Sequence, residues 1–483
     1  MNHPHPSTPR LILLNAAVAL TGVLALLGYS WLLVYQPAAA RQLTAVIVIN
    51  ANIALILLHP IAGFLAWLLL APYAPFLPFD INMPAGVPDL AFVRTVGGFL
   101  ALYLLARVAR RRQQLFALSP VEFAIPFFAL ALLLAALRSN LGWVTATQLA
   151  FDSYLTPLLA YFIARQLIDT PQRLRQMTNA LLLAATIMAA MAISEQLWGV
   201  TLFRNTGTQD FYSAAGVRKV GALLGNPAYI ALAIAVVMPL ALARALETKR
   251  PRRRGVYLLL ILLLAAGVYL TYNRSGWMAG ALALLPLLLL APRLRRPTLL
   301  TLLLAGGLLI ASWNAIESTP VGQRLTAESP IDYRVGALET GLTILRSNPI
   351  LGVGYASFGR IAARMGLRGT GHVFVLPTPH NSYLHLAVSG GLVLLASYLL
   401  LAAALAVTLI GLARRFRAGG EASPFYLLAG WACLLAYFAA SAGFDNNFAI
   451  YANILFWSIM GGILSAAQGQ SARSLPSSIS SHA

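Results

Sequence analysis

Charged residues are scarce in this sequence. Only 10% of its 483 residues are Asp, Glu, Lys or Arg, whereas 59% are hydrophobic. Soluble globular domains carry about 25% charged residues, so this composition excludes an ordinary soluble fold. The apolar residues form many stretches of about 20, the length at which a helix crosses a hydrocarbon core of ~30 Å, and not the short alternating segments of an outer-membrane barrel. We therefore predict an integral membrane protein built as an all-α, polytopic transmembrane helix bundle.

Cysteine is almost absent as well. The single thiol, Cys433, cannot form an intrachain disulfide or a thiolate metal cluster, so redox chemistry has no support. The sequence also lacks an HExxH motif, a carboxylate cluster and the Cys/His spacing of a metal site. We expect Cys433 to pack in the interior, and we expect neither a metal nor another cofactor.

Acidic residues are few, and so are lysines. The chain has 14 Asp and Glu against 34 Lys and Arg, a net charge of +20, and its lysines are Lys219 and Lys249. In a soluble protein this balance would suggest nucleic acid binding. Here the basic residues form short runs between apolar spans, where they orient helices and contact anionic lipid headgroups. We predict membrane lipids as partners and no nucleic acid. The runs are 107–112, 249–254, 293–296 and 414–417.

The apolar pattern predicts about fourteen spans, or twelve to thirteen because only His59 and Pro60 separate the second from the third. If each span crosses once, all four basic runs lie on one side. That side is cytoplasmic by the positive-inside rule, and both termini lie there too. The first span follows a lone Arg10 and exceeds a signal-peptide core, so we expect it to be retained. The spans are 11–34, 42–58, 60–78, 92–109, 121–137, 147–167, 173–198, 226–245, 255–272, 275–291, 297–313, 381–412, 425–443 and 447–467.

Two connections on the opposite, outer face are long, at 199–225 and 314–380. Within the second, four apolar residues share one helical stripe that ends at Asn348-Pro349, which predicts an amphipathic helix. Such a helix lies on the membrane surface or caps a cavity. The stripe consists of Val335, Leu338, Leu342 and Leu345.

These features divide the chain into three parts. Residues 1–198 form N-terminal transmembrane helices, and residues 199–467 form a second membrane region that includes the loop 314–380. Residues 468–483 are Ser-rich and poor in apolar residues, so we predict a disordered cytoplasmic tail.

Three basic features lie on the outer face, where the positive-inside rule does not call for them. Arg218 and Lys219 precede a span, Arg274 lies in a turn between two spans, and His380 begins the span after the long loop. A guanidinium group stays charged and its planar fork binds two phosphate oxygens, which suits a diphosphate at a membrane surface. An imidazole transfers protons near neutral pH, so His380 is a candidate general base. His385 lies about 140° around the helix from His380, and we expect it to pack.

Short motifs between about residues 216 and 462 follow one another in a characteristic order. They read RKVGALLGNP at 218–227, NRSGW at 273–277, NPILGVGYASF at 348–358, and HNSYL at 380–384 followed by Gly390-Gly391. With the large loop before the histidine, this order resembles the O-antigen ligase and O-antigen polymerase family, bacterial inner-membrane glycosyltransferases that use undecaprenyl-diphosphate-linked glycans. Ala228 departs from the family, which often has Asn after the Asn-Pro pair.

The resemblance implies a GT-C-like fold and metal-independent transfer at the periplasmic face of the inner membrane. By matching position, Arg218 and Arg274 hold the diphosphate and His380 activates the acceptor hydroxyl. The resemblance also suggests three further substrate-binding residues, Lys219, Arg334 and Asn381.

We therefore predict an inverting glycosyltransferase that moves a glycan from undecaprenyl diphosphate to a saccharide or lipid A-core acceptor, as a ligase or as a chain polymerase. A lipid-linked oligosaccharide flippase or proton-coupled carrier is the alternative, with Asp152 and Glu195 inside predicted spans as coupling groups. A peptidoglycan-type polymerase is a third possibility, for which the loop supplies Glu317, Glu328, Asp332 and Glu339. The sequence leaves the sugar, the acceptor and the oligomeric state open.

Overall fold

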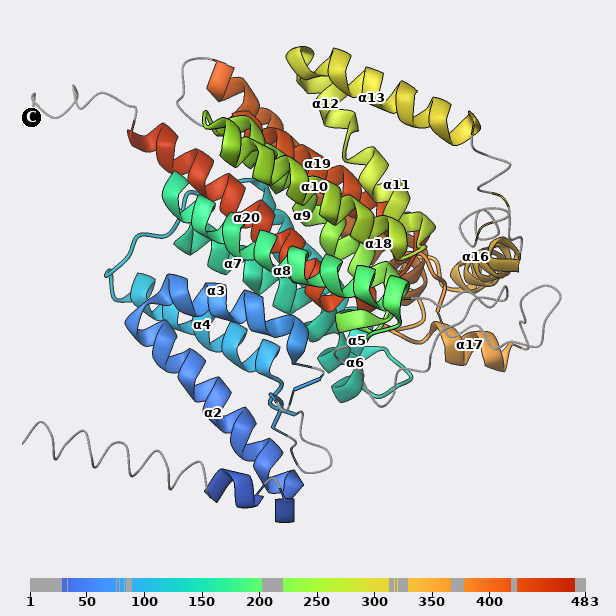
Figure 1. Cartoon of the computed structure of the whole chain (residues 1–483). Helices are drawn as coiled ribbons and strands as arrows, with labels where there is room; N and C mark the ends of the chain where they lie inside the picture. The colour runs from blue at the N-terminus through green and yellow to red at the C-terminus, as the bar shows by residue number, and fades with distance from the viewer. Residues whose placement is uncertain are drawn as a thin grey trace, which may run out of the picture.

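The protein is a bundle of long helices, seen in a computed structural model (Figure 1). Apart from one antiparallel bridge between Ile81 and Leu90, the regular structure of the described residues is helical, which agrees with the predicted all-α fold. The structure describes residues 28–32, 34–74, 76–77, 79–81, 83, 89–201, 220–311, 317, 319, 329–365, 378–417 and 424–473.

The N-terminal helices begin with α2 (Pro37–Leu58) and α3 (Pro60–Leu70), which the sequence left as one element or two. They are two helices, because His59 has a non-helical backbone and Pro60 begins α3. The chain turns back tightly here, since a Cβ on Gly63 would lie 2.9 Å from the Cα of Ile56. After a 3-10 turn at Ala71–Tyr73 follow α4 (Phe92–Ala109) and α5 (Pro120–Leu137).

The next helices carry clear start signals. The stretch α6 (Trp143–Ala150), a π-helical turn (Phe151–Leu155) and α7 (Thr156–Leu167) forms one continuous element. It is followed by α8 (Pro171–Trp198), α9 (Pro227–Glu247) and α10 (Pro251–Leu270). Each of these three helices has proline in its first turn, and the side chains of Thr170 and Asn226 cap α8 and α9.

The remaining helices form the C-terminal part. They are α11 (Arg274–Leu282), α12 (Leu285–Leu290), α13 (Pro292–Ala311), α16 (Ser329–Ser347), α17 (Phe358–Arg364), α18 (Ser382–Arg417), α19 (Pro424–Gly443) and α20 (Ile450–Arg473). A 3-10 turn, η4 (Asn446–Phe448), joins α19 to α20. α20 continues past residue 467, where the sequence predicts its end, so the first residues of the predicted tail are helical. Residues 474–483 lie outside the described ranges.

Most predicted spans lie on described helices, but fewer of these are long enough to cross a membrane than the twelve to fourteen predicted. The span 60–78 contains α3, which has 11 residues, and 275–291 is divided between α11 and α12. Of the first predicted span, residues 11–27 and 33 are not described. Nine of the described helices are long and apolar enough to cross a membrane, which makes this an integral membrane protein. α20 is central, since 94% of its most apolar window is buried against 22% for α2. Cys433 is fully buried beside it, as predicted, and its thiol donates to the Val236 carbonyl at 2.9 Å.

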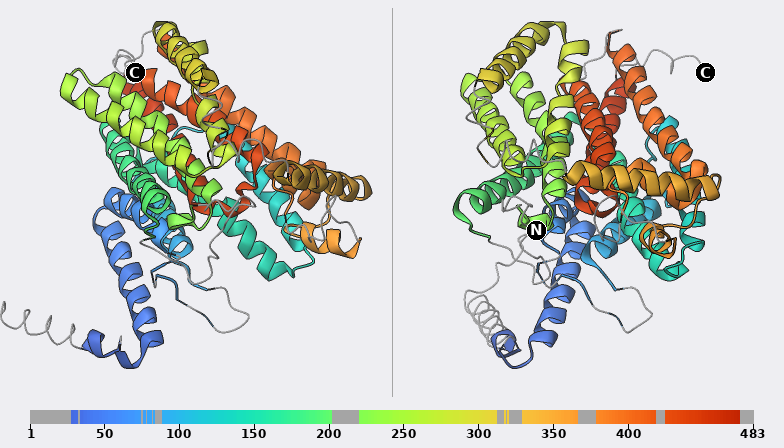
Figure 2. Two further views of the ribbon diagram at one scale, coloured as in Figure 1. Left: turned by 45° about the vertical axis from the view of Figure 1, so that its right-hand side comes forward. Right: turned by 90° about the vertical axis from the view of Figure 1, so that its right-hand side faces the viewer.

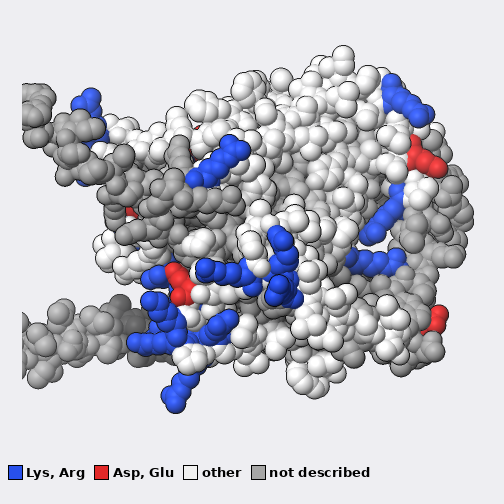
Figure 3. Space-filling view, turned by 90° about the horizontal axis from the view of Figure 1, so that it is seen from above, with Lys and Arg blue, Asp and Glu red and all other residues white. Residues whose placement is uncertain are grey.

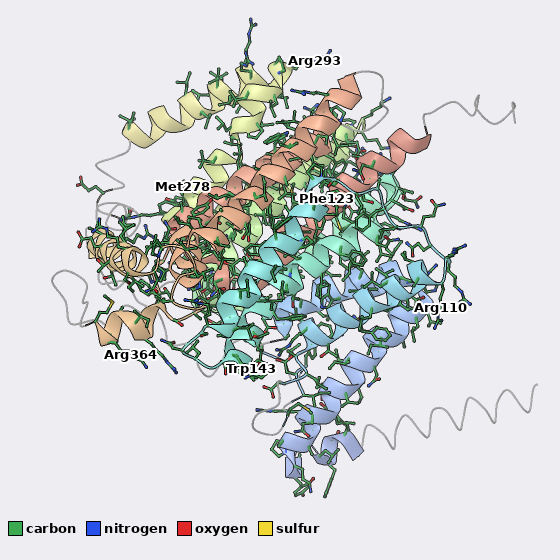
Figure 4. All side chains as sticks on the ribbon, turned by 180° about the vertical axis from the view of Figure 1, so that it is seen from behind. Arg110, Phe123, Trp143, Met278, Arg293 and Arg364 are labelled. Atoms are coloured by element: carbon green, nitrogen blue, oxygen red, sulfur yellow. The ribbon has the colours of Figure 1, made fainter. Side chains whose placement is uncertain are left out.

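Basic runs lie together at one end of the bundle. Arg110 and Arg293, from two different runs, point toward the same end, whereas Trp143 and Arg364 lie at the other (Figure 4). Seen from above, many basic side chains gather on the left, away from the end that carries α16 and α17 (Figure 3). This arrangement agrees with the prediction that the runs share one side of the membrane.

The helix predicted in the long loop is present as α16, which lies across the other helices (Figure 2). Three residues of the predicted apolar stripe, Val335, Leu338 and Leu342, are 45%, 46% and 39% exposed, so the stripe does not form the face that packs on the other helices. The packed face instead holds the fully buried Ile344 and two small residues: Ala337 is also fully buried, and a Cβ on Gly341 would lie 2.7 Å from Leu384 of α18. The smaller side chains allow the two backbones to approach more closely than leucine would.

Candidate active site

The first candidate, Arg274, begins α11, and the helices around it fix its position. The Asn273 side chain caps the helix, accepting from the Gly276 backbone N–H at 2.7 Å. Tyr272, just before the cap, has a left-handed backbone with φ of 51°. Gly276 lies against Ala231 of α9, with only 2.3 Å between a built Cβ and the Ala231 Cβ. The helix cap and this close packing therefore fix the backbone of Arg274.

His380 lies two residues before the start of α18, with an exposed side chain. Its φ is 49°, a left-handed conformation that is uncommon for a residue with a side chain. Such strain costs on the order of 1–3 kcal/mol and is concentrated at functional sites, where the surrounding structure enforces it.

Two neighbours of His380 hold this conformation through bonds to residues 442–447, a segment that comprises the end of α19 and the start of the turn before α20. Asn381 accepts from the Leu384 backbone N–H and donates to the Ala442 carbonyl, both at 3.0 Å. The buried Ser382 hydroxyl donates to the Phe444 carbonyl at 3.2 Å and accepts from the Asn446 N–H at 2.8 Å. Both polar atoms of the Asn381 amide thus bond the protein, so its visible role is to hold His380.

The same segment brings Arg274 and His380 together. Gly443, at the end of α19, packs on Ser275, and a Cβ there would meet the Ser275 hydroxyl. Arg274 therefore lies beside one end of the 442–447 segment while Asn381 is bonded to Ala442 next to it. Residues more than a hundred positions apart in the sequence are thus linked through neighbouring positions of this segment.

Arg334 is the third basic residue near this point. Loss of hydration lowers the pKa of its guanidinium, and the positive charge of Arg274 lowers that pKa further. Arg334 is exposed overall, but neighbouring residues partly desolvate its guanidinium group. Since α16 rests on α18 through Gly341 and Leu384, Arg334 lies about two helical turns from that contact. Arg334 and Arg274 therefore lie near enough for their positive charges to interact.

Arg218 and Lys219 lie outside the described residues. The segment that follows them is well held: the Gly221 N–H donates to the buried Glu195 carboxylate at 3.1 Å. Tyr229, in the first turn of α9, has its ring 6.2 Å from the Phe444 ring. The chain after Arg218 and Lys219 therefore leads to the same 442–447 segment.

His385 is buried, as predicted, but it does more than fill space. Its Nδ1 lies 2.9 Å from Asp445 Oδ2, and both side chains are 3% exposed. Its Nε2 faces the Asn447 amide nitrogen at 3.4 Å, and the Tyr355 hydroxyl donates to the Asn447 amide oxygen. Sequence reasoning did not single out Asp445, although GFDNNF holds the one acidic residue after residue 421 and lies in a connection that the sequence predicts on the outer face.

The other acidic residues proposed from the sequence have local partners or lie apart. Asp152 pairs with Arg94, with 3.4 Å between Oδ1 and Nε, and both residues line the same cavity. Glu339 is exposed on α16, and Glu328 is outside the described residues. Within the described ranges, no three His, Cys, Asp or Glu side chains are grouped so that they could ligate a metal ion.

Comparison with known proteins identifies part of this region. Residues 256–399 match the O-antigen ligase family. The resemblance seen in the sequence is confirmed over this segment, which is less than a third of the chain. No curated protein matches the chain.

The O-antigen ligase segment runs from α10 into α18 and contains Arg274, Arg334, His380 and Asn381. Arg218, Lys219 and Asp445 lie outside it. The family implies joining of glycans, by ligation or polymerisation, at a membrane. Two of its motifs fit together physically, because the Gly352-Val353-Gly354 stretch lies against the α18 kink at Gly390-Gly391. The N–H groups of Val353 and Gly354 donate to the Val388 and Ser389 carbonyls at 2.9 Å.

Proposed function

We propose that this O-antigen ligase-like protein transfers a glycan from undecaprenyl diphosphate to a saccharide acceptor, at the outer, periplasmic end of the bundle. The observation that carries the proposal is the convergence of Arg274 and the strained His380 on the 442–447 segment. Arg334 adds a second positive charge at the same place. An anion-binding pair beside an exposed imidazole is the combination that glycan transfer from a diphosphate needs.

In the proposed reaction the arginines bind the leaving group. Arg274 and Arg334 donate paired N–H groups to the diphosphate oxygens and stabilise the negative charge that develops as the anomeric C–O bond breaks. Arg218 and Lys219, which lie outside the described residues, are proposed to join them because the chain that follows is held near the same segment by Tyr229, whose ring packs on Phe444. Guanidinium groups supply the positive charge that a divalent cation supplies in other diphosphate sites, so the transfer proceeds without a metal.

His380 acts on the acceptor. Its unprotonated ring nitrogen takes the proton from the attacking hydroxyl while that oxygen forms the new bond to the anomeric carbon. Attack opposite the departing diphosphate inverts the anomeric configuration. The products are the lengthened glycan, undecaprenyl diphosphate and a protonated His380, which returns its proton to solvent. Asn381 and Ser382 position this histidine through their bonds to the 442–447 segment.

The test uses purified full-length protein with an undecaprenyl-diphosphate-linked glycan and a saccharide acceptor. His380→Ala should lower the single-turnover transfer rate by about 10²- to 10⁴-fold and leave donor binding near that of the unchanged protein. His59→Ala, at the opposite end of the bundle, is the control and should transfer normally. Transfer at the unchanged rate by His380→Ala would disprove the assignment. Movement of donor across vesicles without any transfer would favour the flippase.

A further inference from the structure

A polar cavity of about 420 Å³ lies at the end of the bundle opposite the candidate active site. It is formed where α8 begins, α9 ends and α10 begins. Three of its lining residues are arginines, Arg175, Arg244 and Arg253, one from each helix. This end carries the basic runs and is predicted to face the cytoplasm.

A single carboxylate serves two of these arginines. Glu247 Oε1 accepts from Arg175 Nη2 at 2.6 Å, and Glu247 Oε2 accepts from Arg244 Nη1 at 2.7 Å. Arg244 is also fixed by Tyr257, whose ring centroid lies 5.4 Å from the guanidinium carbon. Both carboxylate oxygens are therefore used, and the two arginines are held in place before any ligand arrives.

Arg253 has no acidic partner in the described part of the chain, and it is exposed. Three guanidinium groups and one carboxylate give the cavity two excess positive charges. Preorganised arginines with excess charge in a partly enclosed site bind phosphate oxygens with paired, charge-assisted hydrogen bonds.

The α8 residues that line the cavity indicate which kind of phosphate compound it binds. Gln176, Asn179 and Leu183 share one face of this helix, in order of increasing depth from its start. The first two line the cavity, and Leu183 is 52% exposed one turn deeper. A polar site that continues into an exposed apolar face matches a lipid, whose phosphate lies above its acyl chains.

We propose that this cavity binds one anionic phospholipid through its headgroup phosphate, held by Arg175, Arg244 and Arg253. The site differs from general attraction between the 249–254 run and the membrane, because one stoichiometric lipid occupies a built pocket. It does not depend on the proposed glycan transfer, which takes place at the other end.

The test measures lipid retention and melting temperature of the full-length protein with phosphatidylglycerol, with phosphatidylcholine and with soluble glycerol phosphate. Phosphatidylglycerol should raise the melting temperature, and native mass spectrometry should show one retained molecule. Arg253→Gln should weaken that retention by about tenfold, the effect of one lost hydrogen bond to a charged group. Arg252→Gln removes the same charge from the same run outside the cavity and should retain the lipid.

Three results would overturn the proposal. Equal retention by Arg253→Gln and Arg252→Gln would show diffuse attraction to the basic run. Stabilisation by glycerol phosphate equal to that by phosphatidylglycerol would show a site for a soluble phosphate ester. Equal retention of phosphatidylcholine would show that the negative charge is not recognised. Melting in phosphatidylcholine checks that both variants are folded, and Arg253→Lys, which keeps the charge, should retain more lipid than Arg253→Gln.

Discussion

His380 and Arg274 owe their positions to neighbours that carry no chemistry themselves. Asn381, Ser382 and Ser275 anchor the two residues to the 442–447 segment. At His380 these contacts hold a left-handed backbone conformation. A residue with an exposed imidazole and an enforced conformation is presented to a ligand at little further entropic cost.

Replacement of Arg274 by Lys tests the bidentate contact. Lysine keeps the charge but loses the planar fork, so donor binding should weaken by about 2 kcal/mol, the effect of one charge-assisted hydrogen bond. Isothermal titration or a filter assay with labelled donor measures this loss. Arg346→Lys, at the exposed end of α16, is the control and should bind normally. Normal donor affinity in Arg274→Lys would mean that the side chain does not bind the diphosphate and only snorkels to the membrane–water interface.

Replacement of Asp445 by Asn tests the buried pair with His385. The change keeps the shape but removes the carboxylate that lies 2.9 Å from the imidazole, so the free energy of unfolding should fall by about 1–3 kcal/mol. Thermal unfolding in one detergent measures the effect. The exposed pair of Asp169 and Arg173 gives the control, because Asp169→Asn should change stability by less than about 1 kcal/mol. Equal shifts in the two variants would contradict a structural role for the buried pair.

At the scale of elements, contacts between small residues determine how the site is assembled. Gly443 brings α19 onto α11, Gly341 brings α16 onto α18, and Gly276 brings α11 onto α9. Helices in a membrane gain little from apolar burial against one another, so close backbone approach is the main source of their specificity. The glycines at these crossings therefore set the distances between functional side chains on different helices.

Gly443→Ala should impair transfer without touching a reacting group. The new Cβ would meet the Ser275 hydroxyl, so α11 and Arg274 must shift away from the segment that holds His380. A misplacement of about 1 Å can cost about 10²-fold in rate. Single-turnover transfer measures the change. Gly280→Ala, also on α11, is the matched control because a Cβ there meets nothing within 4 Å; it should transfer normally, and equal loss in both would point to general helix destabilisation.

At the scale of the whole molecule, the charge distribution separates the two ends of the bundle. The basic runs lie at one end, and the candidate site lies at the other with α16 across it. This separation gives the protein a predicted orientation, with catalysis outside and an anionic lipid bound inside.

Thiol labelling in a Cys433→Ser background tests that orientation. A cysteine at Glu339 of α16 should react with an impermeant reagent added outside the inner membrane, and one at Arg252 should react only after permeabilisation. Both positions are exposed, so access depends on the side of the membrane alone. The reverse labelling pattern would invert the topology and remove the periplasmic site.

The local pattern of the sequence determined most of the helices. Apolar runs, proline starts and basic runs are read from neighbouring residues, which is why 92–109, 120–137 and 171–198 were predicted almost to the residue. The same local signals indicated Arg274 and His380, because each begins a predicted span at its outer end, where orientation does not require a positive charge.

Only the tertiary structure decided how these residues meet. The packed face of α16 holds Ala337, Gly341 and Ile344 and not the exposed leucines, since the fit to α18 depends on the close approach that Gly341 allows. Asp445 and His385 pair across sixty positions of the chain, and Gly443 meets Ser275 across far more. No periodicity records such contacts, because they arise when separate helices pack and each side chain acquires a neighbour that is remote in sequence.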